Sequence, residues 1–281
     1  MSSSALPSFG ARLTAAVAGR GRLCVGIDPH PGLLASWGLA DDVAGLERFA
    51  LTAVEALAGE VAVLKPQVAF FEAHGSAGLA VLERTTAAAQ AAGALVLADA
   101  KRGDIGSTMA AYARAWLADG SPLAADAVTL SPYLGVGALD PALELAAATG
   151  RGVFVLALTS NPEGAALQRA VGDDGHPVAQ AVVNEVRSRN AGSAGLGSAG
   201  VVIGATVGPH GLDLAGLNGP VLAPGLGAQG ASVADLARVF GDQVHLVLPT
   251  TSRDVLRHGP DVGALRAAAL RVRDEVIAVL G

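Results

Sequence analysis

Residues 94–118, ALVLADAKRGDIGSTMAAYARAWLA, hold a β-type run, a charged turn and a helical stretch in one short unit. The run 94–99 is a block of apolar residues that ends in an aspartate, and the stretch 106–118 carries apolar residues at helical spacing. Near-continuous apolar strands are typical of parallel sheets that helices cover on both faces. This stretch therefore predicts one β/α unit, with its charged residues at the carboxyl end of the strand.

The same kind of unit recurs along the chain. Further β-type runs lie at 22–28, 61–66, 127–132, 152–158, 200–205, 220–225 and 244–249. Helix-length stretches lie at 43–58, 72–92, 138–149, 177–190, 231–240 and 260–280. Eight such runs in about 250 residues predict a single-domain (β/α)8 TIM barrel. An open, doubly wound α/β sheet is the alternative. We expect residues 1–9 to form a flexible tail and residues 10–281 to form the barrel.

Composition excludes several classes of protein. The net charge of −6 argues against a nucleic-acid binder, which usually presents a basic face. No apolar run is long enough to cross a membrane, and the first ten residues lack the pattern of a signal peptide. The single Cys24 excludes an intrachain disulfide and is typical of a small core residue. These features predict a cytoplasmic protein with no nucleic-acid or membrane partner.

Lysine is rare in this chain. Lys65 and Lys101 are the two lysines among nineteen basic residues, and each follows an apolar run. Lysine is a compact point charge that can titrate, whereas arginine is always protonated in proteins. The two lysines are therefore the first candidates for chemistry.

Polar residues follow seven of the eight β-type runs. In a TIM barrel the carboxyl ends of the strands share one face, where active sites are built. The residues that this face would gather are Asp28, Lys65, Asp99, Lys101, Ser131, Thr159, Ser160, Gln229, Ser252 and Arg253.

The spacing of Asp99, Lys101 and Asp104 suggests acid–base chemistry. Residues two apart on a strand point to the same side, so Asp99 and Lys101 would lie together. A lysine between two carboxylates is held as the ammonium, which favours a proton donor over an amine nucleophile. A solvated charge cluster that caps the next helix explains the same spacing equally well.

The segment PGLGAQG (224–230) has the form of a dinucleotide fingerprint, Gly225-x-Gly227-x-x-Gly230. It lies late in the chain, and no acidic residue ends the following run. Loops after the seventh and eighth strands of TIM barrels commonly bind phosphate, so we favour a phosphate site completed by Arg253. The six histidines show no metal-ligand spacing.

The motif DAKRGDIGST, with GIDP on the first run and LKP on the second, closely resembles the orotidine 5′-phosphate decarboxylase family. The segments SPYLG, TSNPEG and PGLGAQG resemble its longer, bacterial branch. The resemblance covers essentially the whole chain, with the motifs in the family's order.

This resemblance implies a homodimeric TIM barrel that converts orotidine 5′-monophosphate to UMP and CO2 in pyrimidine biosynthesis, without metal or organic cofactor. It implies that Lys101 protonates the C6 carbanion beside Asp99 and Asp104. Asp104, Ile105 and Thr108 would reach into the neighbouring subunit's site, so that active sites are shared. The implied substrate contacts are Asp28 and Lys65 to the ribose, Ser160 to the pyrimidine, and Gln229 and Arg253 to the phosphate. Many family members carry glycine before that arginine, where this chain has Ser252.

Two other functions stay open. Mg²⁺-dependent sugar-phosphate decarboxylases and aldolases resemble the chain in its barrel and Asp-x-Lys-x-x-Asp array. Their second strand supplies a carboxylate for the metal, where this chain has Lys65. A non-catalytic phosphosugar-binding barrel is the third possibility.

Overall fold

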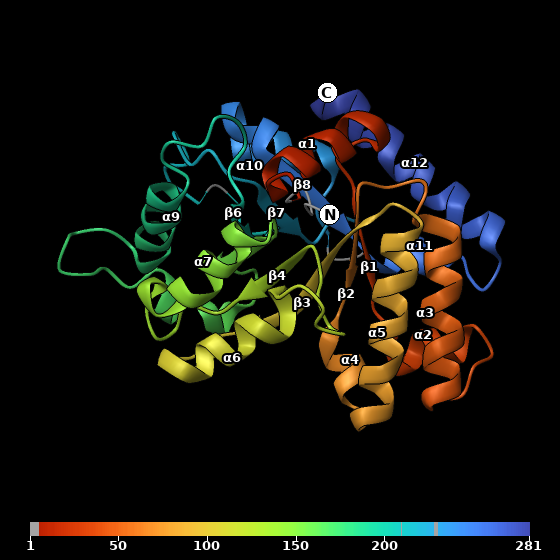
Figure 1. The fold of residues 1–281 in the computed structure, drawn as a ribbon. Helices are drawn as coiled ribbons and strands as arrows, with labels where there is room; N and C mark the ends of the chain where they lie inside the picture. Colours follow the sequence, from red (N-terminus) through yellow and green to blue (C-terminus); the bar gives the residue numbers. More distant parts are fainter. Residues whose placement is uncertain (1–5, 209, 228–229) are drawn as a thin grey trace.

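The computed structural model describes residues 6–208, 210–227 and 230–281. Eight parallel strands pair in sequence order, and the last pairs with the first, so the sheet closes into a barrel (Figure 1). The strands are β1 (Cys24–Ile27), β2 (Val63–Pro66), β3 (Leu95–Arg102), β4 (Ala127–Leu130), β5 (Gly152–Leu158), β6 (Ala199–Ile203), β7 (Val221–Pro224) and β8 (Val247–Thr251). The predicted TIM barrel is confirmed, and the open sheet is excluded.

Helices cover the outside of the barrel. They are α1 (Phe9–Arg20), α2 (Pro31–Ser36), α3 (Val43–Leu57), α4 (Val68–Glu72), α5 (Gly75–Ala91), α6 (Gly106–Leu117), α7 (Asp140–Ala148), α8 (Ala165–Gln168), α9 (Val178–Arg189), α10 (Val233–Phe240), α11 (Arg253–Leu256) and α12 (Val262–Leu280). Short 3₁₀ turns lie at Val136–Leu139, Pro162–Gly164 and Gly241–Leu246. In the expected helical stretch 72–92, α4 ends at Glu72 and α5 begins at Gly75, whose φ of +62° suits glycine at a helix boundary.

Helix α1 closes the amino-terminal end of the barrel. Residues 6–8 are exposed, but Phe9, which the sequence placed in the tail, begins this helix and is 1% exposed. Its ring meets Phe154 of β5 edge to face, with the centroids 5.9 Å apart. The helix had no counterpart in the sequence prediction.

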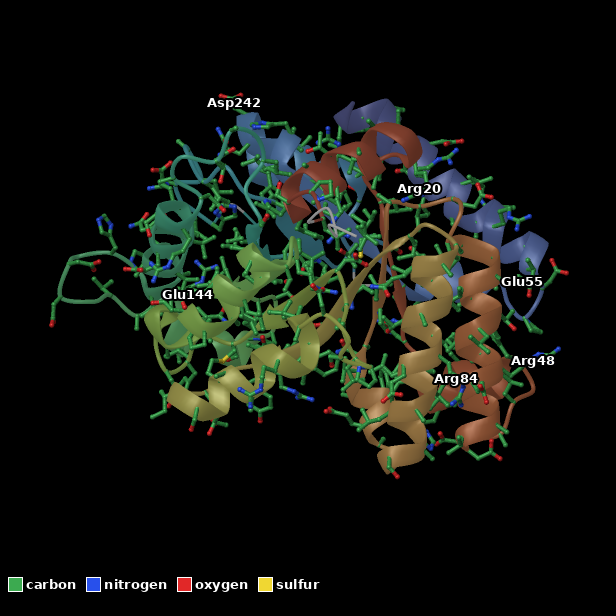
Figure 2. The ribbon with its side chains drawn as sticks, in the orientation of Figure 1. Arg20, Arg48, Glu55, Arg84, Glu144 and Asp242 are labelled. Atoms are coloured by element: carbon green, nitrogen blue, oxygen red, sulfur yellow. The ribbon has the colours of Figure 1, made fainter. Side chains whose placement is uncertain are left out.

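The apolar residues form two layers. An inner cluster fills the barrel and includes Cys24, Leu97 and Phe154 together with Phe9 and Leu13 of α1. A larger cluster lies between the strands and the surrounding helices. Charged side chains project away from these layers, as Arg48 and Glu55 of α3 do in Figure 2. The amino-terminal half of the barrel interior is therefore packed, and the open space inside the barrel lies at the carboxyl ends of the strands.

Cys24 is buried and free, in agreement with its predicted role in the core. The pKa of its thiol is raised to about 12, mainly because the side chain is buried.

Within the described ranges, no helix is both long enough and apolar enough to span a membrane.

Candidate active site

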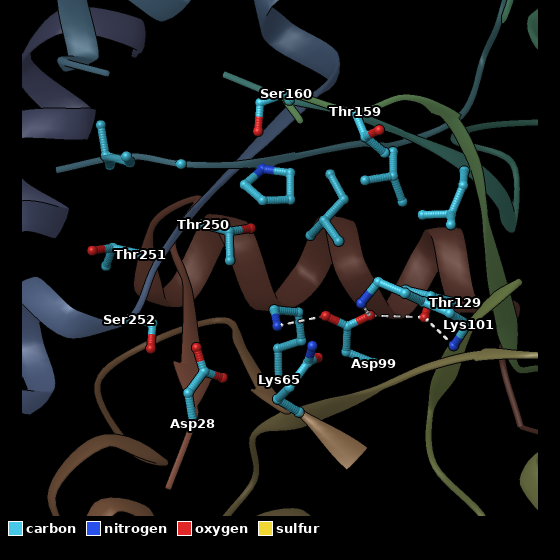
Figure 3. A pocket seen from close by; sticks show the side chains of 18 of the residues that line it. Asp28, Lys65, Asp99, Lys101, Thr129, Thr159, Ser160, Thr250, Thr251 and Ser252 are labelled. Carbon is cyan, nitrogen blue, oxygen red and sulfur yellow. Dashed lines mark hydrogen bonds and ion pairs between the residues drawn. The ribbon is translucent and has the colours of Figure 1, made fainter. Parts of the chain in front are cut away.

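A pocket of about 330 Å³ opens at the carboxyl ends of the strands (Figure 3). Of the ten residues to which the family resemblance gives a role, six line it: Asp28, Lys65, Asp99, Lys101, Ser160 and Arg253. They come from five different strand ends or the loops that follow them, so the barrel gathers residues that are far apart in the sequence.

Lys65, Asp99 and Lys101 form a continuous charged row along one side of the pocket. Lys65 Nζ donates to Asp99 Oδ2 at 2.9 Å, and Lys101 Nζ donates to Asp99 Oδ1 at 2.6 Å. The side chain of Lys65 is 7% exposed and that of Asp99 is 11% exposed, whereas that of Lys101 is 43% exposed. The ammonium of Lys101 is thus the member of the row that a molecule in the pocket can best reach.

The charged row keeps its carboxylate ionised. Burial alone would raise the pKa of Asp99, but the positive charges of Lys65 and Lys101 outweigh it and hold that pKa well below its usual range. Burial would likewise lower the pKa of Lys65, but Asp99 and Asp28 outweigh it and raise that pKa. The pocket therefore holds fixed positive and negative charges before any ligand arrives.

Asp104 is not part of the Lys65–Asp99–Lys101 row of its own chain. Its carboxylate accepts a hydrogen bond from the amide of Ile105 at 2.7 Å, and it does not line the pocket. The spacing had suggested a lysine between two carboxylates, whereas the fold places one carboxylate between two lysines. Ile105 and Thr108 are exposed outside the pocket.

Arg102 and Gly103 attach the end of β3 to its surroundings. The Arg102 guanidinium forms an ion pair with Glu72 of α4 and lies 5.7 and 5.8 Å from the ring centroids of Tyr112 and Trp116 of α6. A side chain at Gly103 would come within 2.2 Å of the Ser131 carbonyl oxygen, so only glycine allows this approach. The two residues between Lys101 and Asp104 thus fix the strand end between the neighbouring helices and strand.

The opposite side of the pocket, at β8 and β1, is less complete. Asp28 Oδ1 and Ser252 Oγ are buried and have no hydrogen-bond partner among the described residues. The two side chains flank Gly26, because a Cβ placed there would lie 3.0 Å from both Asp28 Oδ1 and Ser252 Cβ. Arg253 follows, exposed at the rim of the pocket. All three residues line the pocket, and this side therefore holds polar groups that the described part of the chain does not pair.

The glycine-rich loop follows β7, and Gly225 lines the pocket. Gln229, the predicted phosphate ligand in this loop, lies outside the described residues. The first turn of α10 carries a capping box between Ser232 and Asp235, which satisfies the amides of both residues and places a carboxylate at this helix terminus. Of the expected phosphate ligands, Arg253 is the one that the described residues bring to the pocket.

Sequence reasoning missed several pocket residues with hydroxyl or amide groups. Thr129, Thr250 and Thr251 lie within strands, and Gln67 follows β2. Thr129 Oγ1 donates to Asp99 Oδ1 at 2.9 Å, and the Gln67 amide, when its nitrogen faces Asp99, donates to Oδ2 at 2.6 Å. A lone threonine inside an apolar run carries no signal, because the pattern identifies only the polar residues at the ends of the runs.

Across the ranges that the structure describes, no three His, Cys, Asp or Glu residues gather as metal ligands.

Comparison with known proteins decides the family. Residues 21–268 match the model of the orotidine 5′-phosphate decarboxylase / HUMPS family. The chain belongs to this family. A relative named orotidine 5′-phosphate decarboxylase from Salinispora arenicola is 66% identical over 275 residues, which cover 98% of this chain and 99% of the relative. One of the same name from Streptomyces coelicolor is 61% identical, covering 95% and 96% of the two chains.

Solved structures agree with this family membership. A crystal structure from Streptomyces avermitilis, provisionally named as an orotidine 5′-phosphate decarboxylase, superposes with a TM-score of 0.97 at 61% identity, covering 100% of this chain and 98% of that one. Leishmania donovani UMP synthase superposes with a TM-score of 0.78 at 32% identity, covering 98% of this chain and 56% of that one. The sequence resemblance to the orotidine 5′-phosphate decarboxylase family is confirmed.

Proposed function

We propose that this chain decarboxylates orotidine 5′-monophosphate to UMP and CO2, a step of pyrimidine biosynthesis in the cytoplasm. The observation that carries the proposal is the Lys65–Asp99–Lys101 row in a pocket at the carboxyl ends of the strands. The names of relatives up to 66% identical over nearly the whole chain support the same reaction.

The proposed chemistry uses Lys101 as the proton donor. The bond from C6 of the pyrimidine to the carboxylate breaks, the electron pair stays on C6, and CO2 leaves. The Lys101 ammonium then gives a proton to C6, which forms UMP and a neutral amine that solvent protonates again. A fixed ammonium stabilises the developing negative charge because it needs no reorganisation during the reaction. Asp99 keeps Lys101 aimed into the pocket through the 2.6 Å ion pair.

The other polar residues would hold the substrate. Asp28 and Lys65 would bind the ribose hydroxyls, Ser160 would contact the pyrimidine, and Gln229 and Arg253 would hold the phosphate. Binding of this remote phosphate supplies energy that positions the base for reaction.

We further propose a homodimer whose subunits share their active sites through Asp104, Ile105 and Thr108. Three large apolar side chains are exposed on the loops after β3 and β4: Ile105 is 61% exposed, Tyr133 76% and Leu134 53%. Large apolar side chains exposed on the loops after two neighbouring strands are consistent with a protein partner at this end of the barrel.

Subunit complementation tests this sharing. The K101A and D104A variants are each expected to be nearly inactive alone. When they are unfolded together and refolded, mixed dimers should recover part of the wild-type activity, because one site regains both groups. Active D104A, or no recovery in dimers shown to be mixed, would refute shared sites.

The reaction is proposed to need no metal. Lys65 Nζ lies 2.9 Å from Asp99 Oδ2, so an ammonium occupies the position beside this carboxylate where a divalent cation could bind. A protonated lysine cannot ligate a metal. Full activity in chelator is expected, whereas loss of activity that Mg²⁺ restores would favour the sugar-phosphate branch of the family.

The decisive experiment follows the absorbance of orotidine 5′-monophosphate with wild type and K101A. Wild type should convert it to UMP, and K101A should lose about 1,000-fold or more in kcat, within the range of about 100- to 10,000-fold for general acid catalysis. R114A, which alters a basic residue of α6 outside the pocket, is the control. Wild type that binds the nucleotide without converting it would instead support a non-catalytic binding barrel.

A further inference from the structure

The pairing between β3 and β4 is irregular where the charged row begins. Ala98 pairs with Val128 and Arg102 pairs with Leu130, so Asp99, Ala100 and Lys101 lie opposite Thr129 alone. A bulge of this kind breaks the ladder of main-chain hydrogen bonds and redirects the side chains next to it. The two charged residues of β3 that line the pocket are both inside this bulge.

The backbone of Lys101 is unusual within the bulge. Its φ is +50°, in the left-handed region that non-glycine residues rarely adopt. Such a conformation costs free energy and persists only where surrounding contacts hold it, as commonly happens in active sites. A hydrogen bond to the main chain of Lys101 is one contact that can hold this conformation.

Thr129 supplies this contact. The amide of Lys101 donates to Thr129 Oγ1 at 2.9 Å, and the same hydroxyl donates to Asp99 Oδ1 at 2.9 Å. Asp99 Oδ1 is also the oxygen that accepts from Lys101 Nζ. One hydroxyl thus links the main chain of Lys101 to the carboxylate that orients its ammonium.

Burial makes these hydrogen bonds hard to replace. Thr129 is 1% exposed, so water has little access to its hydroxyl. If the hydroxyl is removed, the Lys101 amide and Asp99 Oδ1 each lose a partner in a site where unsatisfied polar groups are costly. The bulge and the carboxylate would then both be free to shift.

We propose that Thr129 is a positioning residue for proton transfer, whose hydroxyl holds the bulge, the Asp99 carboxylate and the Lys101 ammonium in one geometry. The inference rests on the proposed decarboxylase function. Thr129 acts through Asp99 and Lys101 and not through the substrate's ribose or phosphate, so its removal should lower kcat while KM stays close to that of wild type.

The test compares three variants with wild type. T129V keeps the shape of the side chain and removes both hydrogen bonds; a misplacement of about 1 Å costs on the order of 100-fold, so kcat should fall about 10- to 100-fold. T129S keeps the hydroxyl and should recover most of the lost kcat. T129C carries a weaker hydrogen-bonding group. It should give an intermediate kcat and serves as a second measurement if T129V does not fold.

T85V is the matched control. Thr85 on α5 is also 1% exposed, and its hydroxyl donates to the Val81 carbonyl at 2.8 Å, outside the pocket. Its valine variant loses a buried hydroxyl without touching Asp99 or Lys101. Thermal unfolding of both valine variants should show a loss of stability, but only T129V should show a lower kcat below its melting temperature.

The outcomes separate this inference from the proposed function. Wild type without turnover would overturn the proposed function and, with it, this inference. Active wild type together with T129V of wild-type kcat would overturn the role of Thr129 alone. So would T129S that loses as much kcat as T129V, or a T129V defect that lies in KM.

Discussion

The two sides of the pocket differ in how completely their polar groups are satisfied. One side of the pocket is formed by β2, β3 and β4 and is called here the β2–β4 side. There Asp99 Oδ2 accepts a hydrogen bond from Lys65, and Asp99 Oδ1 accepts hydrogen bonds from Lys101 and Thr129. On the β8–β1 side, Asp28 Oδ1 and Ser252 Oγ have no partner among the described residues, and Arg253 is exposed. One side is complete without a ligand, and the other has hydrogen-bonding capacity left over.

This difference indicates a division of labour. Groups that stabilise a transition state work best when they are already in place, because they then need no reorganisation during the reaction. Groups that bind a substrate can instead complete their hydrogen bonds with it. Changes to Asp99, Lys101 and Thr129 should therefore affect kcat, and changes on the β8–β1 side should affect KM.

Asp99→Asn should break the complete side most severely. It removes the central charge of the row and leaves the buried ammonium of Lys65 without its ion pair. We expect kcat to fall about 100- to 1,000-fold and the free energy of unfolding to fall by about 3 kcal/mol. Enzyme kinetics and urea unfolding measure the two effects.

Asp126→Asn is the control for this prediction. Asp126 is a buried carboxylate paired with Arg12, outside the pocket. The D126N variant should be less stable than wild type, and its folded form should keep the wild-type kcat. A D99N variant with wild-type kcat would contradict the assignment of the β2–β4 side to chemistry.

Arg253→Ala tests the incomplete side. A hydrogen bond to a charged group contributes about 1.5–3 kcal/mol, so KM should rise about 10- to 100-fold while kcat changes less. Initial rates over a range of substrate concentrations separate the two constants. Arg238→Ala, at an exposed arginine of α10 that pairs with Asp235, should leave both unchanged. A loss confined to kcat would contradict the proposed division.

The pH dependence of unfolding tests the ion pairs of Asp99 in a second way. Because the folded pKa of Asp99 is lowered, its ion pairs add stability above its unfolded pKa of about 3.9, and this stability is lost as the pH falls toward the folded pKa. The difference in free energy of unfolding between wild type and D99N should therefore shrink as the pH drops from about 5 to about 3. Urea unfolding at several pH values measures it, and a constant difference would refute the link.

Ser252→Ala should have the smallest effect. It removes the unpartnered hydroxyl and keeps the Cβ beside Gly26. A neutral hydrogen bond contributes about 0.5–1.5 kcal/mol, so KM should rise about 2- to 10-fold if the substrate satisfies this hydroxyl. An unchanged KM would show that the substrate does not bind the Ser252 hydroxyl.

The sequence predicted the barrel because each strand was a clear apolar block with a polar end. The same reasoning brought Lys65 and Lys101 to one site, since strand ends meet in a closed barrel. It misjudged which charges pair, because Asp104 is close to Lys101 in sequence, whereas Lys65 becomes a neighbour of Asp99 only through the pairing of β2 with β3.

The bulge and helix α1 could not be predicted in this way. A bulge depends on the register between two strands, and the sequence of one strand alone does not encode that register. Thr129 therefore looked like one more residue of an apolar run. Phe9 and Leu13 of α1 lie in an alanine-rich stretch, and their burial depends on the open end of the barrel that they fill.

The left-handed backbone of Lys101 has a consequence for the evolution of this chain. Glycine is the residue that this φ favours, and replacing lysine with glycine would relieve a conformational cost of about 1 kcal/mol or more. The same replacement would remove the proposed proton donor. Selection against backbone strain alone would thus drive this position toward glycine, whereas the ion pair with Asp99 and the proposed proton transfer both favour the lysine.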